Sequence, residues 1–135
     1  MPSPASVDLR VLTGVTVLVV DDDLDARELL HTVLEYCGAR VVSAESAQGA
    51  LSMLGHQRPD VVVSDIVMPG DDGYALLRAL KSRAAMRDVP VVALTGYDFA
   101  HAANEALAAG FAAYLKKPVQ PLDLCRTVAE VRRKR

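Results

Sequence analysis

Four apolar segments of this 135-residue sequence are each followed by side chains that could do chemistry. The acidic run Asp21–Asp23 follows the first segment, and Asp65 ends the second. Thr95 ends the third, and Lys117 follows the fourth. Carboxylates that lie close together cost stability, so a cluster of these acids is favourable around a hard divalent cation. Mg²⁺ prefers such oxygen ligands and keeps waters that a phosphate can replace. The hydroxyl of Thr95 and the ammonium of Lys117 could then donate hydrogen bonds to phosphoryl oxygens.

The elements that would position these residues alternate regularly along the chain. Short apolar runs predict strands at Val15–Val20, Val41–Ala44, Val61–Ser64, Val89–Leu94 and Ala112–Leu115. Five stretches between and after the strands predict helices by their periodicity. The first begins near Ala26, stops at Gly38 and repeats apolar residues at Leu29, Leu30, Val33, Leu34 and Cys37. The second is capped by Ser46, with Ala47, Ala50, Leu51 and Leu54 inward.

The third helix has Leu76, Leu77 and Leu80 inward, and the fourth covers Phe99–Ala109. The fifth begins at Pro121, with Leu124, Cys125, Val128 and Val131 inward.

This alternation predicts an α/β fold with a parallel sheet that is covered by helices on both faces. The strands carry continuous apolar runs, as expected where neither face is wet. Right-handed crossovers leave few topologies, and the flavodoxin-like doubly wound (βα)5 sheet, strand order 2-1-3-4-5, is common at this size. Sites in such sheets lie beyond the carboxyl ends of the strands. Asp21, Asp22, Asp65, Thr95 and Lys117 are therefore expected at one edge.

Composition limits the class of protein. The 15 Lys and Arg residues against 17 Asp and Glu give a net charge of −2, which provides no general electrostatic reason to bind nucleic acid. Apolar residues make up 51% of the chain, as in an ordinary globular domain. The longest apolar stretches are too short for a membrane span, which needs roughly 18 residues. One domain with its own core is expected.

The termini and the cysteines give further expectations. Residues 1–13 predict a loose leader, residues 14–132 the folded domain, and residues 133–135 a basic tail. The first residues have neither a basic start nor an apolar core, so no export signal is visible. Cys37 and Cys125 make no disulfide framework and are expected to be separate, buried and inert thiols. A cytoplasmic location follows from these two features.

The first loop argues against one common ligand of this fold. A flavin mononucleotide site needs a loop rich in Gly, Ser and Thr, whose N–H groups surround the phosphate. Here the first loop carries Asp21, Asp22 and Asp23 and would repel a phosphate. Any phosphate bound at this edge would need a metal ion as a bridge.

Four motifs in matched order carry a family resemblance. They are Val-Leu-Val-Val-Asp21-Asp22-Asp23, Ser64-Asp65-Ile-Val-Met68-Pro69-Gly-Asp-Asp72-Gly73, Leu94-Thr95-Gly96 and Tyr114-Leu-Lys-Lys117-Pro118. Together they resemble the response-regulator receiver domains of two-component signalling, over roughly Val15 to Val131. Single-domain receivers and those of hybrid histidine kinases are the most similar kinds. Asp71 and Val119 depart from the common pattern, in which apolar Met and Phe are frequent.

The resemblance implies a role for each matched residue. Asp65 would be the phosphoacceptor, taking a phosphoryl group from a histidine kinase or a histidine phosphotransfer protein. Asp21, Asp22, Asp65 and the backbone carbonyl of Val67 would bind Mg²⁺ or Mn²⁺. Thr95 and Lys117 would bind the phosphoryl group.

Three further positions concern switching and lifetime. Tyr114 would be the aromatic switch that turns inward as Thr95 moves, although a tyrosine there could also simply pack against the last helix. Val67 and Tyr97 hold the two positions that commonly help to place the hydrolytic water. Val67 cannot orient a water and Tyr97 is bulky, so a long-lived phosphorylated state is expected.

The expected role is signalling without enzymatic turnover on other substrates. No output domain is expected after the fifth helix, so the target would be another protein or a second copy of the chain in a phosphorylation-dependent homodimer. No membrane or nucleic-acid partner is expected. The alternative is a Mg²⁺-dependent phosphatase of the haloacid-dehalogenase type, because Asp21-x-Asp23 is similar to its first motif. Asp25 occupies the position of a Thr or Val in that motif, and no acid pair follows Lys117 on a further strand.

Overall fold

The computed structural model describes residues 10–68, 73–96 and 99–133, and its strands and helices alternate along the chain. The strands are β1 (Thr16–Val20), β2 (Arg40–Ala44), β3 (Val61–Asp65), β4 (Val91–Thr95) and β5 (Ala113–Lys116). The helices are α1 (Leu24–Tyr36), α2 (Ala47–Met53), α3 (Gly73–Lys81), α4 (Phe99–Ala109) and α5 (Pro121–Arg133). Each expected element is present, with ends that differ by a few residues from the expected ones.

The strands form one parallel sheet in the order β2-β1-β3-β4-β5, which confirms the predicted topology. The strands β1, β3 and β4 lie inside the sheet, and every residue of β3 and β4 is buried. This burial explains why these segments are apolar without alternation, because helices cover both of their faces. The doubly wound order also places the ends of β1 and β3 side by side.

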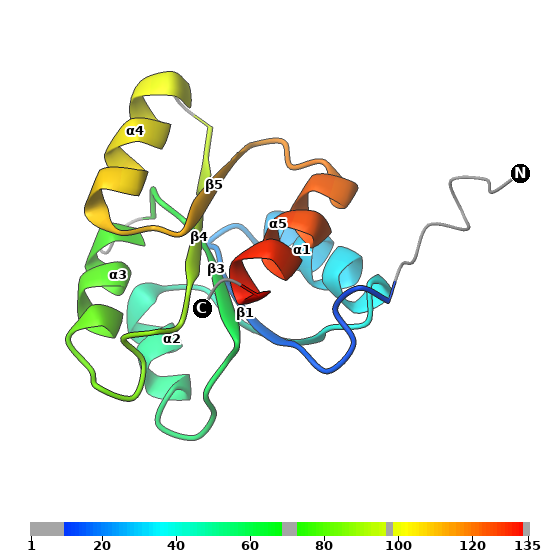
Figure 1. Cartoon of the computed structure of the whole chain (residues 1–135), viewed down its shortest axis with the longest axis horizontal. Coiled ribbons are helices and arrows are strands. Elements are labelled where there is room, and N and C mark those ends of the chain that lie inside the picture. Colours follow the sequence, from blue (N-terminus) through cyan, green and yellow to red (C-terminus); the bar gives the residue numbers. More distant parts are fainter. Residues whose placement is uncertain (1–9, 69–72, 97–98, 134–135) are drawn as a thin grey trace, which may run out of the picture.

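Two helical layers cover the sheet (Figure 1). Helices α1 and α5 lie together on one face, and α2, α3 and α4 cover the other. Each face has its own apolar cluster, with Leu34 and Val128 fully buried on the α1–α5 side and Leu76 and Ala106 on the opposite side. Within the described part of the chain, no helix is long and apolar enough to cross a membrane.

The ends of α1 and α2 follow from their local sequence. Asp23 caps α1 by accepting a hydrogen bond from the N–H of Ala26, and Ser46 caps α2 in the same way through Gly49. Gly38 follows α1 with a φ of 97°, a conformation that favours glycine. Of the apolar positions at helical spacing in α1, Leu29 is 60% exposed, because it lies at the border of the helical stripe.

The segment before β1 contributes to the core. Leu12 is fully buried, and its N–H donates to the carbonyl of Cys37 at 2.9 Å. This leucine falls inside the expected leader of residues 1–13, so part of that segment packs against the domain. The boundary at residue 14 stays a prediction.

The two cysteines differ from expectation. Each is buried, as predicted, but the structure pairs Cys37 with Cys125 as a disulfide between α1 and α5. The expectation of two separate thiols was wrong because the 88 residues between them hide their proximity. Only the packing of α1 against α5 brings the two sulfurs together.

Candidate functional site

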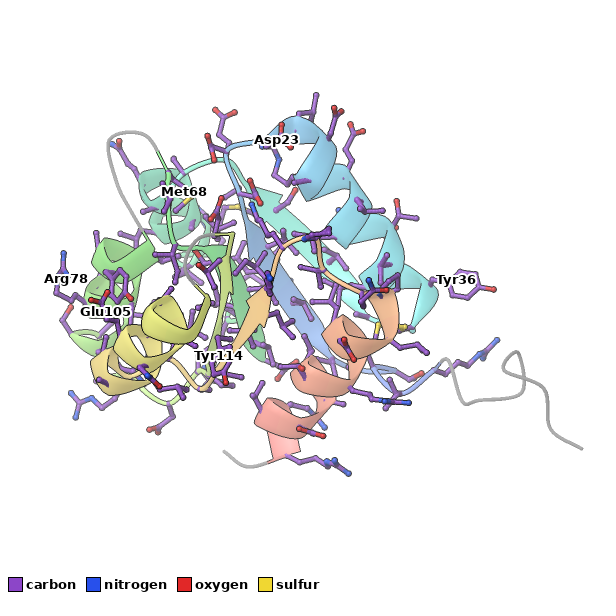
Figure 2. All side chains as sticks on the ribbon, turned by 90° about the horizontal axis from the view of Figure 1, so that it is seen from above. Asp23, Tyr36, Met68, Arg78, Glu105 and Tyr114 are labelled. Carbon is purple, nitrogen blue, oxygen red and sulfur yellow. A yellow bond between two sulfur atoms is a disulfide. The ribbon has the colours of Figure 1, made fainter. Side chains whose placement is uncertain are left out.

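The carboxyl edge of the sheet collects the polar residues that sequence analysis singled out. Asp21 follows β1 directly, Asp65 ends β3 and Thr95 ends β4, and all three are buried. In Figure 2, the labelled residues Asp23 and Met68 mark the loops after β1 and β3 on this side of the molecule. Buried polar side chains are rare in a domain of this kind, so their concentration at one edge marks this place as the site.

Lys117 joins the two buried acids. Its Nζ donates to Oδ2 of Asp65 at 2.9 Å and to Oδ2 of Asp21 at 3.1 Å. Because Lys117 follows β5 at the sheet margin, its side chain extends past the end of β4 to reach them. The same residue is fixed through its backbone, since its N–H donates to the carbonyl of Thr95 at 2.8 Å. Asp21, Asp65, Thr95 and Lys117 therefore form one connected group.

In this group one ammonium, that of Lys117, faces the two carboxylates of Asp21 and Asp65. Burial raises the pKa of Asp65, and this outweighs the opposing effects of Lys117 and of the Val67 N–H, which donates to the carboxylate at 3.1 Å. Burial by itself would lower the pKa of Lys117, but its hydrogen bonds to Asp65 and Asp21 raise it above its usual value. A carboxylate that is disfavoured by burial gains from any further cation.

The acids can hold a metal ion. One oxygen each from Asp21, Asp22 and Asp65 lies within 4.8 Å of the others. Asp22 is exposed, so solvent reaches the cluster from that side. Three hard oxygen ligands, open to water and without His or Cys among them, suit Mg²⁺ or Mn²⁺ better than a soft metal. The expected role of the Val67 carbonyl stays a prediction.

Two positioning contacts at the first loop involve α1. Arg27 donates from Nη1 to the backbone carbonyl of Asp21 at 2.8 Å. The N–H of Asp23 donates to Oδ1 of Asp21 at 3.0 Å and turns the chain into the helix. Sequence reasoning missed Arg27, because an arginine in the first turns of a helix carries no signal of its own.

Gly73 is a second residue whose role the sequence did not reveal. Its N–H donates to the carbonyl of Ile66 at 2.8 Å, so α3 begins directly against the end of β3. A Cβ atom at position 73 would lie 2.6 Å from the carbonyl oxygen of Asp65 and 3.0 Å from Cα of Ile66. Both neighbours are backbone atoms that cannot rotate away. Position 73 must therefore be a glycine if the backbone of Asp65 is to keep its position.

The structure describes two more of the predicted site residues, Thr95 and Tyr114. The side chain of Thr95 is 2% exposed at the end of β4. Tyr114 is half-buried on β5, packs against the α2–α4 apolar cluster and lines a pocket of about 560 Å³ with Lys81 and Leu107. Figure 2 shows it away from the edge that carries Asp23. Tyr97 and the acidic pair Asp71–Asp72 lie outside the described residues.

An apolar groove of about 520 Å³ begins at this edge. Its lining includes Asp23, Gly96 and Lys117 at the site. One wall comes from α1, through Leu29, Leu30 and Val33, and the other from Val119, Pro121 and Leu124 at the start of α5. The Lys117–Pro118 peptide bond in the connection to α5 is cis. The exposed Leu29 is thus part of the α1 wall of the groove.

Comparison with known proteins gives one family for most of the chain. Residues 17–129 match the model of the response regulator receiver domain. A 14.6 kDa uncharacterized protein encoded in the sodA1 3′ region of Leptolyngbya boryana is 41% identical over 122 residues, which cover 90% of this chain and 93% of that protein.

A longer relative and a solved structure agree with this match. The phosphate regulon transcriptional regulatory protein PhoB of Escherichia coli K12 is 33% identical over 118 residues, which cover 87% of this chain and 52% of PhoB. This chain therefore spans about half the length of PhoB. The crystal structure of the signal receiver domain of a signal transduction histidine kinase from Syntrophus aciditrophicus is 30% identical, with a TM-score of 0.81 over 90% of this chain and 92% of that one.

Proposed function

Because the chain belongs to the response regulator receiver domain family, we propose that it accepts a phosphoryl group on Asp65 in a two-component or phosphorelay pathway. The donor is a phosphorylated histidine on a kinase or a phosphotransfer protein. One observation carries the proposal: Asp65 ends the central strand beside two further acids, with Lys117 donating to its carboxylate at 2.9 Å.

The transfer needs a carboxylate nucleophile, charge neutralisation and alignment. An oxygen of Asp65 attacks the phosphorus, a P–O bond forms, and the P–N bond to the imidazole of the donor breaks. Lys117 already donates to Asp65 and would move its hydrogen bond to a phosphoryl oxygen. The hydroxyl of Thr95 would donate to another.

Asp21, Asp22 and Asp65, with the carbonyl of Val67, would hold Mg²⁺ or Mn²⁺. When bound, that ion supplies positive charge to the phosphoryl oxygens. Arg27 and the cap at Asp23 keep the first loop in position through the contacts with Asp21 described above. On this proposal the chain acts on its own carboxylate and turns over no other substrate.

The output is a change of conformation that another protein reads. Tyr114 would respond to movement of Thr95, and a phosphorylation-dependent homodimer is one way to transmit the change. We place the protein in the cytoplasm with its kinase, and expect neither nucleic acid nor a membrane as a direct partner.

The test is phosphorylation by acetyl phosphate in the presence of Mg²⁺, followed by intact-mass analysis. The parent protein should gain one phosphoryl group, and Asp65→Asn should gain none, because the amide keeps the shape but loses the nucleophile. Asp88→Asn is the matched control, since Asp88 is an exposed acid outside the cluster. A phosphoryl group on Asp65→Asn contradicts the assignment, and multiple turnovers on a small phosphate ester would favour a phosphatase instead.

A further inference from the structure

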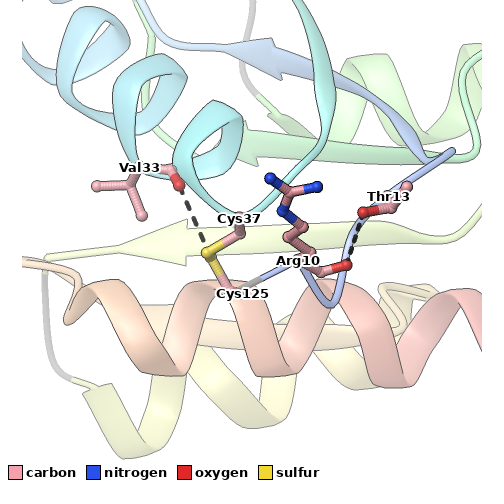
Figure 3. Close-up of a disulfide and its surroundings, with 5 residues drawn as sticks. All are labelled: Arg10, Thr13, Val33, Cys37 and Cys125. Carbon is pink, nitrogen blue, oxygen red and sulfur yellow. Dashed lines mark hydrogen bonds between the residues drawn. A yellow bond between two sulfur atoms is a disulfide. The ribbon is translucent and has the colours of Figure 1, made fainter. Parts of the chain in front are cut away.

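The disulfide between Cys37 and Cys125 lies in the layer formed by α1 and α5 (Figure 3). Cys37 is the C-cap residue of α1, and Cys125 lies in the second turn of α5. Their Cα atoms are 6.7 Å apart, within the range that a disulfide bridges. The bond therefore links two helices whose packing already places the cysteines together.

Three segments of the chain converge on this place. The N–H of Leu12 donates to the carbonyl of Cys37, so the turn before β1 is attached to the end of α1. In that turn the hydroxyl of Thr13 donates to the carbonyl of Arg10 at 2.8 Å, as Figure 3 shows. A Cβ at Gly38 would lie 2.8 Å from the hydroxyl oxygen of Thr13. These contacts hold the end of α1 and the turn before β1 together without any contribution from the sulfur atoms.

The structure also accommodates the reduced state. Sγ of Cys125 lies 3.9 Å from the carbonyl oxygen of Val33, where a thiol can donate a weak hydrogen bond. Both cysteines belong to the apolar cluster on the α1–α5 side, in which free thiols pack as small hydrophobic groups. In the reduced state Cys125 would therefore have an acceptor, and Cys37 would pack as a small hydrophobic group.

A reagent can reach the pair through the end of α1. Cys37 is 5% exposed, but its neighbours Tyr36 and Gly38 are exposed, and Figure 2 shows Tyr36 pointing away from the molecule. Helix ends open locally at a small fraction of the free energy of unfolding. Fraying of this last turn would expose the sulfur of Cys37 while the rest of the domain stays folded.

The pair also lies just beyond the walls of the apolar groove. Val33, one turn before Cys37, lines the α1 wall, and Leu124, the neighbour of Cys125, lines the α5 wall. At its other end the groove includes Lys117 of the phosphoacceptor site. A covalent bond here would hold the two walls together when the helices move.

We propose that Cys37 and Cys125 form a reversible thiol–disulfide site, oxidised by hydrogen peroxide and reduced by a dithiol, that locks α1 to α5 and fixes the groove between them. In oxidation the Cys37 thiol gives up its proton and the thiolate sulfur attacks one peroxide oxygen. The O–O bond breaks, and the hydroxide that leaves takes that proton, so a sulfenic acid and one water form. Cys125 then attacks that sulfur, the S–S bond forms, and the departing hydroxide takes the thiol proton to become the second water. A dithiol returns two electrons and two protons.

The disulfide should act mainly on the stability of the fold, because its two cysteines are far apart in sequence. The two cysteines are 88 residues apart, and closing so long a loop removes much of the entropy of the unfolded chain. Oxidation should raise Tm by about 10 °C or more. It should also slow amide hydrogen exchange at the end of α1 and along α5. This inference does not depend on the chemistry of Asp65.

The experiment treats the reduced full-length chain with hydrogen peroxide under native conditions, then alkylates the unfolded protein and measures its intact mass. The parent should stay monomeric and take up no alkyl group after oxidation, and two after a dithiol is added to the folded protein. Its Tm should rise and fall with these treatments. After peroxide, the Cys37→Ala variant should keep its one thiol open to alkylation. The Cys125→Ala variant should instead gain the mass of one oxygen, because the sulfenic acid on Cys37 has no partner thiol. The Tm of neither variant should rise with peroxide.

Three results would overturn the proposal. The first is that both thiols of the parent are alkylated after peroxide treatment. The second is that oxidation yields sulfinic acid or intermolecular dimers instead of an internal bond. The third is that a dithiol fails to open the bond in the folded protein. A Tm that rises on oxidation in the Cys37→Ala, Cys125→Ala double variant would show that the shift has another origin.

Discussion

The two ends of helix α1 are attached to the rest of the molecule by different chemistry. At its start, Asp23 and Arg27 contact the first loop through hydrogen bonds to Asp21, next to a cluster of acids. At its end, Cys37 is bonded to Cys125 among apolar side chains. The first end is held by polar contacts that a cation or a phosphoryl group can rearrange. The second end is held by packing and by one covalent bond.

The difference indicates which properties each end controls. Removing a carboxylate from a crowded acidic cluster relieves repulsion, so substitutions there should change ligand binding more than folding. Removing apolar contacts or a covalent bond at the far end costs stability directly. Loss of a carboxylate from the acidic cluster should therefore change chemistry, and substitutions at the disulfide end should change Tm.

Gly73→Ala should give the largest effect. It should lower both Tm and the rate of phosphorylation, so it does not follow the division between the two ends of α1. The added methyl group would overlap the backbone carbonyl of Asp65, so β3 or α3 must shift. Overpacking of this kind costs about 1–3 kcal/mol of stability. Displacing the nucleophile by about 1 Å should slow phosphorylation by acetyl phosphate about 100-fold.

The measurements for this variant are Tm and the initial rate of phosphorylation by intact mass. Gly55→Ala is the matched control, since a Cβ there would lie 3.7 Å from the carbonyl oxygen of Ser52, an ordinary van der Waals distance. If Gly73→Ala is phosphorylated at the parent rate, the backbone at the end of β3 tolerates the shift and the close approach has no bearing on the chemistry.

Asp22→Ala should sharpen the comparison by separating metal binding from folding. Asp22 is exposed and one of three neighbouring acids, so its loss should leave the Tm without metal nearly unchanged. At Mg²⁺ ten times above the dissociation constant, the parent should gain about 1.4 kcal/mol of stability. The variant should gain much less at the same concentration.

Asp23→Ala is the counterpart of that variant and gives the opposite pattern. It loses the hydrogen bond to the N–H of Ala26 and should cost about 1 kcal/mol without metal. Its stabilisation by Mg²⁺ should remain. Thermal unfolding of both variants over a Mg²⁺ titration is the measurement. An equal response to Mg²⁺ in Asp22→Ala and the parent would place the ion elsewhere.

The smallest expected effect concerns how long the phosphorylated state lasts. Val67 is 49% exposed two residues after Asp65 and carries no group that can orient a water. Introducing Val67→Asn together with Tyr97→Glu should speed loss of the phosphoryl group about tenfold, which corresponds to about 1.4 kcal/mol in the barrier. The metal-free Tm should stay near that of the parent.

A decay time course in excess Mg²⁺ compares the parent, the double variant and Val67→Asn alone. Tyr36→Ala, an exposed change at the disulfide end, is the control and should decay at the parent rate. Equal lifetimes in the parent and the double variant would mean that water placement at these two positions does not limit hydrolysis.

Local patterns in the sequence determined the order and type of the elements and the cap at Ser46. The strand order followed from these elements together with the rule of right-handed crossovers. Strand runs, helical stripes and caps depend on neighbours within a few residues, so they can be predicted before the chain is folded. The same patterns placed Asp21, Asp65, Thr95 and Lys117 at one edge, because parallel strands bring their carboxyl ends together.

Only the tertiary structure decided the contacts between separate elements of the fold. Packing of α1 against α5 paired Cys37 with Cys125, and the approach of α3 to β3 made a glycine necessary at position 73. The bond from Arg27 to the carbonyl of Asp21 and the exposure of Leu29 also depend on where α1 sits on the sheet. These features arise from the positions of rigid elements in space, and no short window of sequence contains that information.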